Sequence, residues 1–433
     1  MLPHLVTAVP GPRSLALAER LRHVETHNVT YLAANWPVFW ERADGSAVWD
    51  ADGNRFLDLT SAFGVAGLGH SRPEVVRALW DQSERLIHAM GDVHPTELKV
   101  RLCERLSAMT FERWGAGPGK TTLSNSGFEA VETALKTAFI ATGRPGVVTF
   151  HNAYHGLGYG ALLGAGIDKF RAPFAGQLAE VSHHLGFPRS AAELDGCREA
   201  LGMLDPARIG ALLVEPIQGR GGKVVPPAGF LTMLRTWCDS HGVILIFDEI
   251  YSGFNRTGKL FACEWDAVVP DLICLGKGLS SGFPISACVG KAAVMDAWPV
   301  STGEALHTST FLGNPLGCAM ALAATEIHLR AETAAQVARA GEMLAGALRS
   351  IDAPGVLEIR GRGLMLGMQL GSSGGGTAGA RAGQVLEEML RRGVIMLADG
   401  PAGDVLAFTP PFALGETEIS WVAGQLEEVL RAV

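Results

Sequence analysis

One lysine stands between two glycines directly after an apolar run, in the stretch Ile273-Cys-Leu-Gly-Lys277-Gly-Leu-Ser-Ser-Gly-Phe-Pro284. A lysine taken at random lies in a solvated loop, because its ammonium group is strongly hydrated. At the mouth of a buried strand, however, burial lowers the pKa of an amine and makes its neutral, nucleophilic form available. Lys277 is therefore a candidate for amine chemistry, provided that other segments bring it a partner.

Two carboxylates follow a second apolar run, because Asp248 and Glu249 come directly after Val243-Ile-Leu-Ile-Phe247. A buried carboxylate without a partner costs several kcal/mol, so this position needs a cation or strong hydrogen-bond donors. An aspartate can also be an ordinary helix N-cap. A functional role for Asp248 requires a cation brought by a ligand, such as a protonated ring nitrogen.

A helix that begins with small polar residues is predicted upstream, where Asn125, Ser126, Gly127 and Phe128 precede an apolar helical pattern. Free backbone N–H groups and the positive end of the helix dipole allow such a start to bind phosphate. Ordinary capping is the alternative, because every helix has an N-terminus. The neighbouring glycine-rich stretch does not predict a nucleotide P-loop, because Trp114 stands where that motif requires glycine.

The segment His151-Asn-Ala-Tyr154-His155-Gly156 follows another predicted strand. Its two histidines resemble half of a metal site, but no third ligand is evident in the sequence, so no metal is predicted. An aromatic side chain at a strand end can stack on a flat cofactor. Tyr154 is the candidate for this role, and His155 beside it is assigned to the same site.

These four parts have one chemistry in common. A phosphate cradle, a stacking ring, a buried carboxylate and a lysine at a strand end are what pyridoxal 5′-phosphate requires. The lysine holds the aldehyde as a Schiff base. The carboxylate keeps the pyridine nitrogen protonated, which makes the ring an electron sink. No single part is decisive, and the prediction depends on the ordered set.

Apolar runs that alternate with helical segments position these residues. Continuous apolar runs separated by helices indicate a mostly parallel sheet, buried on both faces, in an α/β domain. Ligands of such sheets bind beyond the carboxyl ends of the strands, where Asp248 and Lys277 both stand. The predicted strands are 146–150, 209–214, 243–247 and 272–275.

The two ends of the chain have a different pattern. Two Asp-Gly turns among aromatic and branched residues predict a β-meander within 36–59. After Pro315 a long alanine-rich helix and several short strands and helices indicate a small α+β domain. We expect a segment 1–60 that is part of the small domain, a large cofactor-binding domain 61–315 and a C-terminal small domain 316–433.

The composition excludes several classes of partner. The 433 residues carry a formal net charge of −8, which argues against a nucleic-acid or membrane-surface binder. Seven scattered cysteines without a C-x-x-C pair indicate reduced thiols. No apolar run approaches the roughly 18 residues of a membrane span. A soluble, cytoplasmic protein with small-molecule partners is expected.

From about Gly11 to the C-terminus the sequence resembles the class III aminotransferases of the fold-type I pyridoxal-phosphate enzymes, the group of ornithine, 4-aminobutyrate, acetylornithine and ω-amine transaminases. The resemblance implies that Lys277 is the Schiff-base lysine and that Asp248 is the partner of the pyridine nitrogen. It also implies cofactor-binding roles, which fall on Ser126, Gly127, Phe128, Tyr154, His155, Tyr251 and Thr310.

Two further motifs carry this resemblance. Leu213-Val-Glu215-Pro-Ile-Gln-Gly219 matches the family pattern V-E-P-x-Q-G, which implies that Glu215 is an active-site carboxylate. The segment from His307 to Pro315 matches the family segment whose threonine, here Thr310, reaches the phosphate of the neighbouring subunit. The resemblance therefore implies a homodimer, or a higher oligomer, with active sites shared across the interface.

Departures from the family pattern concern the substrate. Members that use glutamate carry an arginine shortly before a Pro-Pro pair, and Ala407 stands at that position here. Without the arginine, Glu215 lacks its usual gating partner, which favours pyruvate, or a less acidic carbonyl compound, over 2-oxoglutarate as the acceptor. Compensation by another arginine, Arg220 or Arg256, is the alternative. Tyr251 replaces the glutamine or aliphatic residue of many members. Trp36 and Phe63 are candidates for lining the substrate pocket, and core packing explains them equally well.

The resemblance implies an aminotransferase that moves an amino group from an amine, or from an ω- or other amino acid, to a keto acid. The expected mechanism is ping-pong and passes through Lys277. An amino-acid racemase or epimerase, or an aminomutase, would use the same lysine and cofactor and stays an alternative. A non-catalytic binding module is a third reading, which the intact Lys277, Asp248 and Glu215 disfavour.

Overall fold

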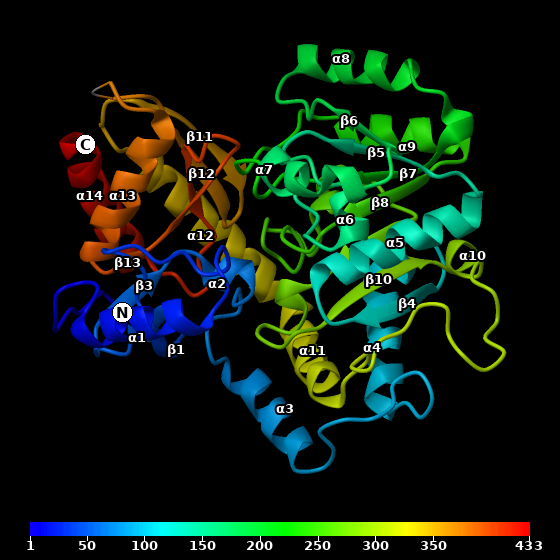
Figure 1. The fold of residues 1–433 in the computed structure, drawn as a ribbon, viewed down its shortest axis with the longest axis horizontal. Helices are drawn as coiled ribbons and strands as arrows, with labels where there is room; N and C mark the ends of the chain where they lie inside the picture. Colours follow the sequence, from blue (N-terminus) through cyan, green and yellow to red (C-terminus); the bar gives the residue numbers. More distant parts are fainter. Residues whose placement is uncertain (374) are drawn as a thin grey trace. The chain divides into compact units, whose positions relative to one another are not determined.

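The computed structural model describes residues 1–373 and 375–433, which form two compact units (Figure 1). Unit 1 consists of Met1–Arg72 and Gln336–Val433. Unit 2 is the continuous segment Pro73–Ala335 and contains Lys277, Asp248 and Glu215. The domain bounds expected from the sequence stay a prediction.

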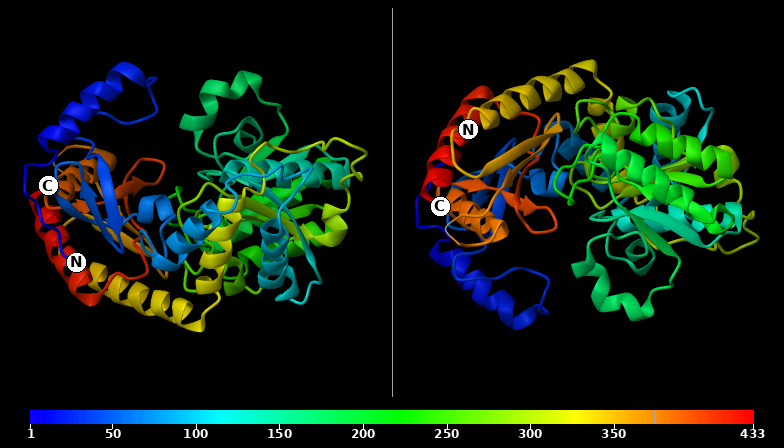
Figure 2. Two further views of the ribbon diagram at one scale, coloured as in Figure 1. Left: turned by 90° about the horizontal axis from the view of Figure 1, so that it is seen from below. Right: turned by 90° about the horizontal axis from the view of Figure 1, so that it is seen from above.

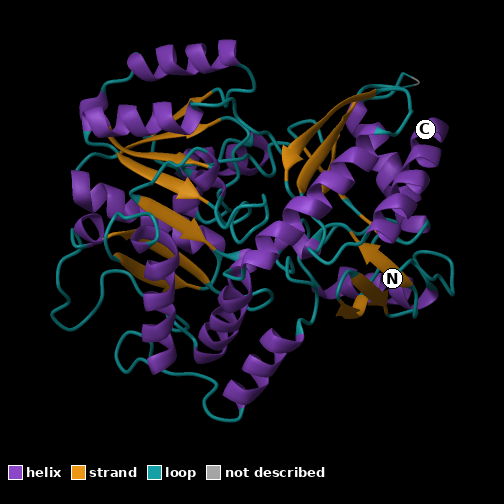
Figure 3. Ribbon diagram, turned by 180° about the vertical axis from the view of Figure 1, so that it is seen from behind, coloured by secondary structure: helices purple, strands orange, loops and turns teal. Residues whose placement is uncertain are grey.

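Unit 2 is built on a seven-stranded sheet in the order β4-β10-β9-β8-β7-β5-β6. From β9 to β6 every neighbouring pair is parallel, whereas β10 is antiparallel to both β9 and β4. Figure 3 shows these strands with helices around them. The mostly parallel α/β sheet expected from the sequence is confirmed.

Both faces of this sheet are buried against helices. In β7 (Ile209–Val214) Leu213 packs into one core with Val131 of helix α5 (Gly127–Thr142). Its neighbour Leu212 packs into the other core with Leu234 of helix α9 (Phe230–His241). Successive side chains of a strand point to opposite faces, so burial on both faces requires a continuous apolar run.

The elements of unit 2 alternate along the chain as a parallel sheet requires. The helices are α3 (Pro73–Ser83), α4 (Glu97–Ser107), α5, α6 (Tyr159–Leu162), α7 (Asp168–Arg171), α8 (Ala191–Gly202), α9, α10 (Ala292–Met295) and α11 (Pro315–His328). The strands are β4 (Gly119–Ser124), β5 (Gly146–Phe150), β6 (Ser182–Leu185), β7, β8 (Ile244–Asp248), β9 (Leu272–Leu275) and β10 (Ser286–Lys291).

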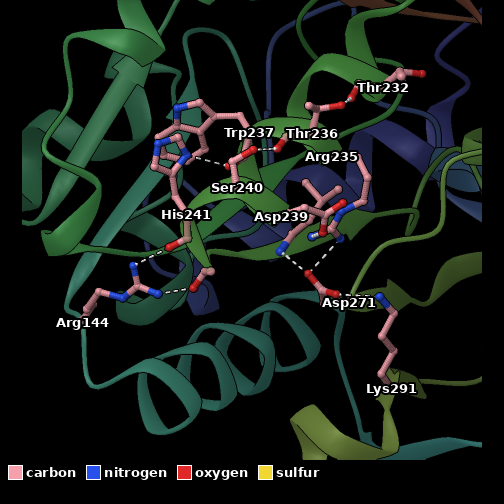
Figure 4. Close-up of polar contacts among 12 residues, drawn as sticks. Arg144, Thr232, Arg235, Thr236, Trp237, Asp239, Ser240, His241, Asp271 and Lys291 are labelled. Carbon is pink, nitrogen blue, oxygen red and sulfur yellow. Dashed lines mark hydrogen bonds and ion pairs between the residues drawn. The ribbon is translucent and has the colours of Figure 1, made fainter.

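The amino ends of the central strands are tied by charged side chains (Figure 4). Asp271, directly before β9, accepts hydrogen bonds from Arg235 of α9 and from Lys291 of β10, each at 2.8 Å. Asp271 Oδ2 also accepts the Leu245 N–H of β8 at 2.9 Å. Arg144, after α5, donates to the carbonyl oxygen of His241 at the end of α9 at 3.0 Å. These contacts join strands and helices at one end of the sheet.

Unit 1 contains two four-stranded sheets, in the orders β1-β2-β3-β13 and β11-β12-β15-β14. Both ends of the chain lie on this unit (Figure 2), where the amino group of Met1 contacts Glu418. The predicted meander is β1 to β3. The strands are β1 (Trp40–Asp44), β2 (Ala47–Asp50), β3 (Arg55–Asp58), β11 (Val356–Arg362), β12 (Met365–Leu370), β13 (Val394–Ile395), β14 (Leu397–Asp399) and β15 (Val405–Phe408). The helices are α1 (Pro12–Val24), α2 (Ser61–Gly64), α13 (Ala378–Arg391) and α14 (Glu416–Ala432).

The alanine-rich segment after Pro315 forms two helices rather than one long helix. The first is α11, and the second, α12 (Ala331–Arg349), continues into unit 1. Carbonyl groups in the last turn of α11 accept hydrogen bonds from side chains. The Asn255 amide donates to the carbonyl oxygen of His328 at 2.8 Å, and the Thr333 hydroxyl donates to that of Ile327 at 2.7 Å. Such side-chain bonds satisfy the free carbonyls of a helix end, so the helix stops there. Among the described residues, no helix combines the length and the apolar character that crossing a membrane requires.

Candidate active site

Lys277 lies in a tight turn at the carboxyl end of β9. It opens the short 3-10 turn Lys277–Leu279, and its backbone adopts a φ of 42°, which is uncommon for a residue with a side chain. A Cβ atom at Gly278 would lie 3.0 Å from the Cβ atom of Phe254, so this neighbour must be small. Strained backbone at the end of a strand is a frequent feature of functional sites.

A buried histidine supports the lysine turn from α11. His328 Nε2 donates to the carbonyl oxygen of Gly278 at 3.2 Å, and Asn255 Nδ2 lies 3.3 Å from His328 Nδ1. Burial lowers the pKa of His328 to about 3, so its imidazole is neutral at physiological pH. Sequence analysis did not find this residue, because a single histidine in an apolar helix carries no recognisable motif.

The carboxylate of Asp248 lies at the carboxyl end of β8, one strand away from β9. Its Oδ2 accepts a hydrogen bond from His155 Nδ1 at 2.8 Å, and its Oδ1 accepts the Ile250 N–H at 3.1 Å. Both Asp248 and His155 are buried. His155 Nε2 is also buried and has no hydrogen-bond partner among the described residues. Of the two histidines that resembled a metal pair, His155 contacts Asp248, whereas the ring of His151 lies 5.9 Å from the ring of His184 between centroids.

The neighbouring Glu249 has a different role from Asp248. Its carboxylate accepts the N–H groups of Ala262 and Cys263 at 3.0 and 2.7 Å, and the hydroxyl group of Ser252. Burial raises the pKa of Glu249 to about 7. This carboxylate connects the end of β8 to the turn Ala262–Trp265. Among the described residues, no group of three or more His, Cys, Asp or Glu side chains could hold a metal ion.

Glu215 follows β7 and joins two loops of the site. Its Oε2 accepts the N–H of Tyr154 at 3.1 Å, and its Oε1 accepts the N–H of Gly219 at 2.9 Å. Burial raises the pKa of Glu215 to about 7, and the charge of Asp248 adds to this rise, while His155 opposes it. The carboxyl group can therefore gain or lose a proton near neutral pH.

The start of α5 has the features of an anion cradle. The helix begins at Gly127 with Ser126 as the N-cap, and Glu129 Oε2 accepts the N–H groups of Asn125 and Ser126 at 3.0 and 2.7 Å. A Cβ atom at Gly127 would lie 2.9 Å from the Ile250 side chain, which packs close to the helix start. The first N–H groups of a helix have no acceptor within the helix and favour an anion. The Ser126 hydroxyl lies 3.0 Å from Glu129 Oε2, so backbone groups carry the anion site.

The loop that carries Tyr154 and His155 lies against this helix start. A Cβ atom at Gly156 would lie 2.3 Å from the Cβ atom of Phe128, and the φ of Gly156 is 101°. Tyr154 is partly exposed, and its ring centroid lies 5.4 Å from the guanidinium carbon of Arg220. Burial raises the pKa of the Tyr154 phenol. The loop thus brings Tyr154, His155 and the start of α5 together.

Tyr251 is the aromatic residue beside the lysine amine. The Lys277 Nζ lies 4.6 Å from the centroid of its ring. Burial lowers the pKa of Lys277, and the charge of Lys223 lowers it further, whereas Tyr251, Asp248 and Glu215 oppose the effect. Tyr251, which departs from the family pattern, therefore contacts the amine of Lys277.

The remaining predicted residues are divided between the two units. Trp36, Phe63 and Ala407 belong to unit 1, where Ala407 is buried in β15, Phe63 is 57% exposed and Trp36 packs on a small core. Thr310 is exposed in unit 2, and its neighbour Ser309 accepts a hydrogen bond from Asn125 at 3.2 Å. The segment with Thr310 therefore lies beside the start of α5.

The residues at the carboxyl ends of the strands fit pyridoxal phosphate. The start of α5 offers backbone donors to a phosphate, and added Cβ atoms at Gly127 and Gly156 would disturb that cradle. Asp248 is a buried carboxylate that can accept from a ring N–H, and Lys277 is an amine whose pKa is lowered. Each chemical part that the cofactor requires is present within unit 2.

Comparison with known proteins gives the same class. The family model described as aminotransferase class-III matches residues 30–430. A 4-aminobutyrate aminotransferase of Mycobacterium tuberculosis is 38% identical, over 96% of this chain and 95% of its own. An acetylornithine aminotransferase of Methanopyrus kandleri is 37% identical, over 94% of this chain and 97% of its own. The chain belongs to the class-III aminotransferase family and is a pyridoxal-phosphate-dependent aminotransferase.

Solved structures agree with this assignment. An amine transaminase from an uncultivated Pseudomonas species, solved with pyridoxal phosphate bound, superposes with a TM-score of 0.86 at 30% identity. The match covers 94% of this chain and 98% of that one. The resemblance to class III aminotransferases and the fold-type I class expected from the sequence are confirmed. The relatives described here are aminotransferases, so the comparisons do not favour the racemase alternative.

Proposed function

We propose that this chain binds pyridoxal phosphate through Lys277 and transfers an amino group from an amine or an ω-amino acid to a keto acid by a ping-pong mechanism. The observation that carries this proposal is the meeting of Lys277 and Asp248 at the carboxyl ends of adjacent strands β9 and β8. The lowered pKa of Lys277 favours the neutral amine that such chemistry needs.

When bound, the cofactor would supply an electron-withdrawing ring that stabilises negative charge on the carbon of the donor. Asp248, oriented by His155, would accept a hydrogen bond from the protonated ring nitrogen. The backbone N–H groups of Gly127 and Phe128 would hold the phosphate. Tyr154 would lie on the ring face, and Tyr251 would contact the ring beside Lys277.

Lys277 has two tasks in the proposed mechanism. It would hold the cofactor covalently through its Nζ when no donor is bound, and its free amine would move the proton of the donor carbon, first as the general base and then as the general acid. The second task requires an amine that is neutral at the start. A keto acid would accept the amino group in the second half-reaction. Glu215, with a pKa of about 7, is an active-site carboxylate whose charge changes near working pH.

The acceptor is proposed to be pyruvate in preference to 2-oxoglutarate. Ala407 cannot bind a carboxylate, because it has no polar side chain and is 3% exposed. Relatives named for 4-aminobutyrate, 5-aminovalerate and ornithine support an ω-amino group on the donor. Trp36 and Phe63 stay candidates for contacts to the donor side chain.

A matrix of donors and acceptors tests the substrate proposal. Purified holoenzyme is incubated with each of several amines and ω-amino acids together with either pyruvate or 2-oxoglutarate, and the keto and amino products are quantified. A higher kcat/KM with pyruvate is expected. A higher value with 2-oxoglutarate would contradict the acceptor proposal. Loss of optical activity of one amino-acid enantiomer without any keto acid would instead indicate a racemase.

Replacing the lysine tests the core of the proposal. Lys277→Ala should lower turnover at least about 10³-fold, since both the covalent anchor and the general base are lost. The visible absorption band that borohydride removes in the wild type should also be absent. Lys120→Ala, which removes an exposed lysine from β4 of the same sheet, is the matched control and should keep full activity. Near-normal turnover in Lys277→Ala would exclude the assignment.

A homodimer with shared sites is also proposed. Two segments of unit 2 lie together and expose apolar side chains: Asn314 Nδ2 donates to the carbonyl oxygen of Ile87 at 3.2 Å, and Thr308 donates to Asp92 at 2.6 Å. Ile87 is 62% exposed and Phe311 58%. A second subunit would cover these side chains and receive Thr310 at its phosphate site.

The free thiols of all seven cysteines support a cytoplasmic location.

Light scattering measures the oligomeric state directly. A mass of twice the 45.7 kDa of one chain, or a higher even multiple, is expected. Thr310→Ala should weaken binding of pyridoxal phosphate without changing this mass. A monomer with full activity at low protein concentration would exclude shared sites.

A further inference from the structure

A second lysine is buried at the candidate active site. Lys223 is fully buried, and its backbone φ of 57° places it in a tight turn after Glu215. The turn is closed by reciprocal backbone hydrogen bonds between Gln218 and Val224 at 3.0 and 3.1 Å. Lysine is among the residues least often fully buried, so this position needs a physical reason.

The side chain of Lys223 ends at Tyr251. Its Nζ donates to the Tyr251 hydroxyl at 3.2 Å and lies 4.3 Å from the centroid of the ring. The Lys277 Nζ lies 4.6 Å from the same centroid, so the two amines are within about 9 Å of each other. A Cβ atom at Gly219 would lie 2.4 Å from Cδ1 of Tyr251, so the glycine allows the ring to rest on the turn.

We infer that Lys223 is a positioning residue of the active site, which holds Tyr251 beside the Lys277 amine and places a second positive charge next to it. This inference rests on the proposed role of Lys277. The turn closes through backbone bonds between Gln218 and Val224, and the Lys223 Nζ lies closer to the Tyr251 hydroxyl, at 3.2 Å, than to the Gly219 carbonyl oxygen of the turn, at 3.5 Å. Two cations close to one another disfavour each other's charged form.

The charged and titratable groups around Lys277 act on its amine in opposite directions. Tyr251, Asp248 and Glu215 favour the protonated amine, and Lys223 is the charged side chain that opposes them. Without Lys223 the proton on the Lys277 nitrogen would be held more tightly. Lys223 would thus set the pH range in which this nitrogen is free of a proton.

The test is a pH titration of the visible absorption band of the holoenzyme, compared between wild type and Lys223→Met. Methionine keeps most of the side-chain volume and removes the charge. At a separation within about 9 Å and an effective dielectric constant of about 20 to 80, the charge accounts for roughly 0.3 to 1.3 pH units. Because a neighbouring cation is lost, the midpoint should move upward by that amount. Turnover at pH 7 should fall, with a smaller change in KM than in kcat.

One further variant separates the effect of the charge from that of the hydrogen bond, and a second variant is its control. Lys223→Gln removes the charge but can still donate to the Tyr251 hydroxyl, so it should show the same upward shift with a smaller change in visible circular dichroism. Lys259→Met is the matched control, because it removes an exposed lysine whose Nζ lies 5.2 Å from the ring of Trp265. Its midpoint should equal that of the wild type.

Each outcome decides the inference. A folded Lys223→Met with the wild-type midpoint and wild-type kcat overturns it. Failure of both Lys223→Met and Lys223→Gln to fold also overturns it, since Lys223 would then be a structural residue of the turn. If the wild type itself has no borohydride-sensitive band, the proposed function fails first. If the wild type has the band and the titration midpoint of Lys223→Met equals that of the wild type, the role of Lys223 is excluded and the proposed function is unaffected.

Discussion

At the scale of single residues, Asp248 and His155 form a buried pair in which the two side chains have different proposed tasks. Asp248 would contact the cofactor, and His155 would orient Asp248. In the proposed site Asp248 would meet the cofactor nitrogen, whereas His155 acts on Asp248 through one hydrogen bond of 2.8 Å. A carboxylate that loses its charge can no longer favour a protonated ring nitrogen. Loss of the histidine leaves the carboxylate in place with the Ile250 N–H as a remaining donor.

This division predicts an order of effects. Asp248→Asn should lower kcat by at least about 100-fold, because the charge opposite the ring nitrogen is lost. His155→Gln should lower kcat by only about tenfold, because Gln can still donate one hydrogen bond. Steady-state kinetics at saturating cofactor measures both values. An equal loss in both variants would show that His155 contacts the reacting groups itself.

Sequence reasoning located most candidate residues but not their partners. Asp248, Glu215 and Lys277 were predicted because each follows an apolar run or lies in a family motif. Lys223 and His328 were missed, because their roles depend on hydrogen bonds to Tyr251 and Gly278, which are distant in the chain. A sequence pattern records spacing along the chain, whereas these contacts arise from how separate loops pack.

At the scale of elements, the central strands could be predicted and the marginal ones could not. Runs such as 209–214 are apolar throughout because both faces of β7 are buried. In contrast, β11 (Val356–Arg362) has no fully buried residue, and the apolar run of β10 (Ser286–Lys291) is only three residues long, from Ala287 to Val289. Neither has a periodic apolar pattern, so their place in a sheet is set by pairing with β12 and with β9 and β4.

The loop that carries Tyr154 and His155 gives a prediction at this scale. Gly156→Ala places a Cβ atom 2.3 Å from Phe128 at a φ of 101°, so the loop must move away from the start of α5. Affinity for pyridoxal phosphate should fall about tenfold or more, equivalent to about 1.4 kcal/mol. Fluorescence titration of the apoenzyme with the cofactor measures this change.

The control for this variant lies in α8. Gly196→Ala adds a Cβ atom with nothing within 4 Å in an ordinary helix, so cofactor affinity should be unchanged. The midpoint of thermal unfolding should stay equal or rise slightly, because alanine is favoured over glycine in helices by roughly 0.5–1 kcal/mol. Unchanged affinity in Gly156→Ala would show that the loop does not position the cofactor.

The amino ends of the strands give a second prediction for elements. Asp271→Ala removes the carboxylate that Arg235 and Lys291 share and the acceptor of the Leu245 N–H, whereas Arg235 keeps its contact with Asp239 at 2.7 Å. Leaving such partly buried donors without an acceptor costs about 1–3 kcal/mol. Calorimetry of the apoenzyme should show a thermal unfolding midpoint several degrees lower. The KM values for donor and acceptor should stay close to those of the wild type. Large changes in KM with an unchanged midpoint would contradict a structural role.

At the scale of the whole molecule, the buried carboxyl groups make stability depend on pH. Glu249 has a folded-state pKa of about 7, raised from 4.5 by burial. Between these two pH values the folded chain binds more protons than the unfolded chain, so stability falls as pH rises. Glu215 has the same folded-state pKa and the same sign.

Glu249→Gln tests this dependence. The variant should be less stable at pH 5, because the amide NH2 group cannot accept a hydrogen bond and leaves at least one of the three donors around Glu249 without an acceptor, at a cost of about 1–3 kcal/mol. From pH 5 to pH 8 its midpoint of thermal unfolding should fall less steeply than that of the wild-type apoenzyme. Parallel curves for the two proteins would show that Glu249 does not titrate in this range.

The placement of Asp271 at one end of the sheet and of Lys277 at the other has a practical meaning for engineering. Heat tolerance can be raised by redesign around Arg235, Asp271 and Lys291 while the substrate range is left alone. If Tyr251 and Glu215 line the proposed site, substitutions around them would alter the substrate range with little effect on the ion pairs at the far end. Libraries of variants for the two aims can therefore be built separately and combined afterwards, since distant sites act nearly additively.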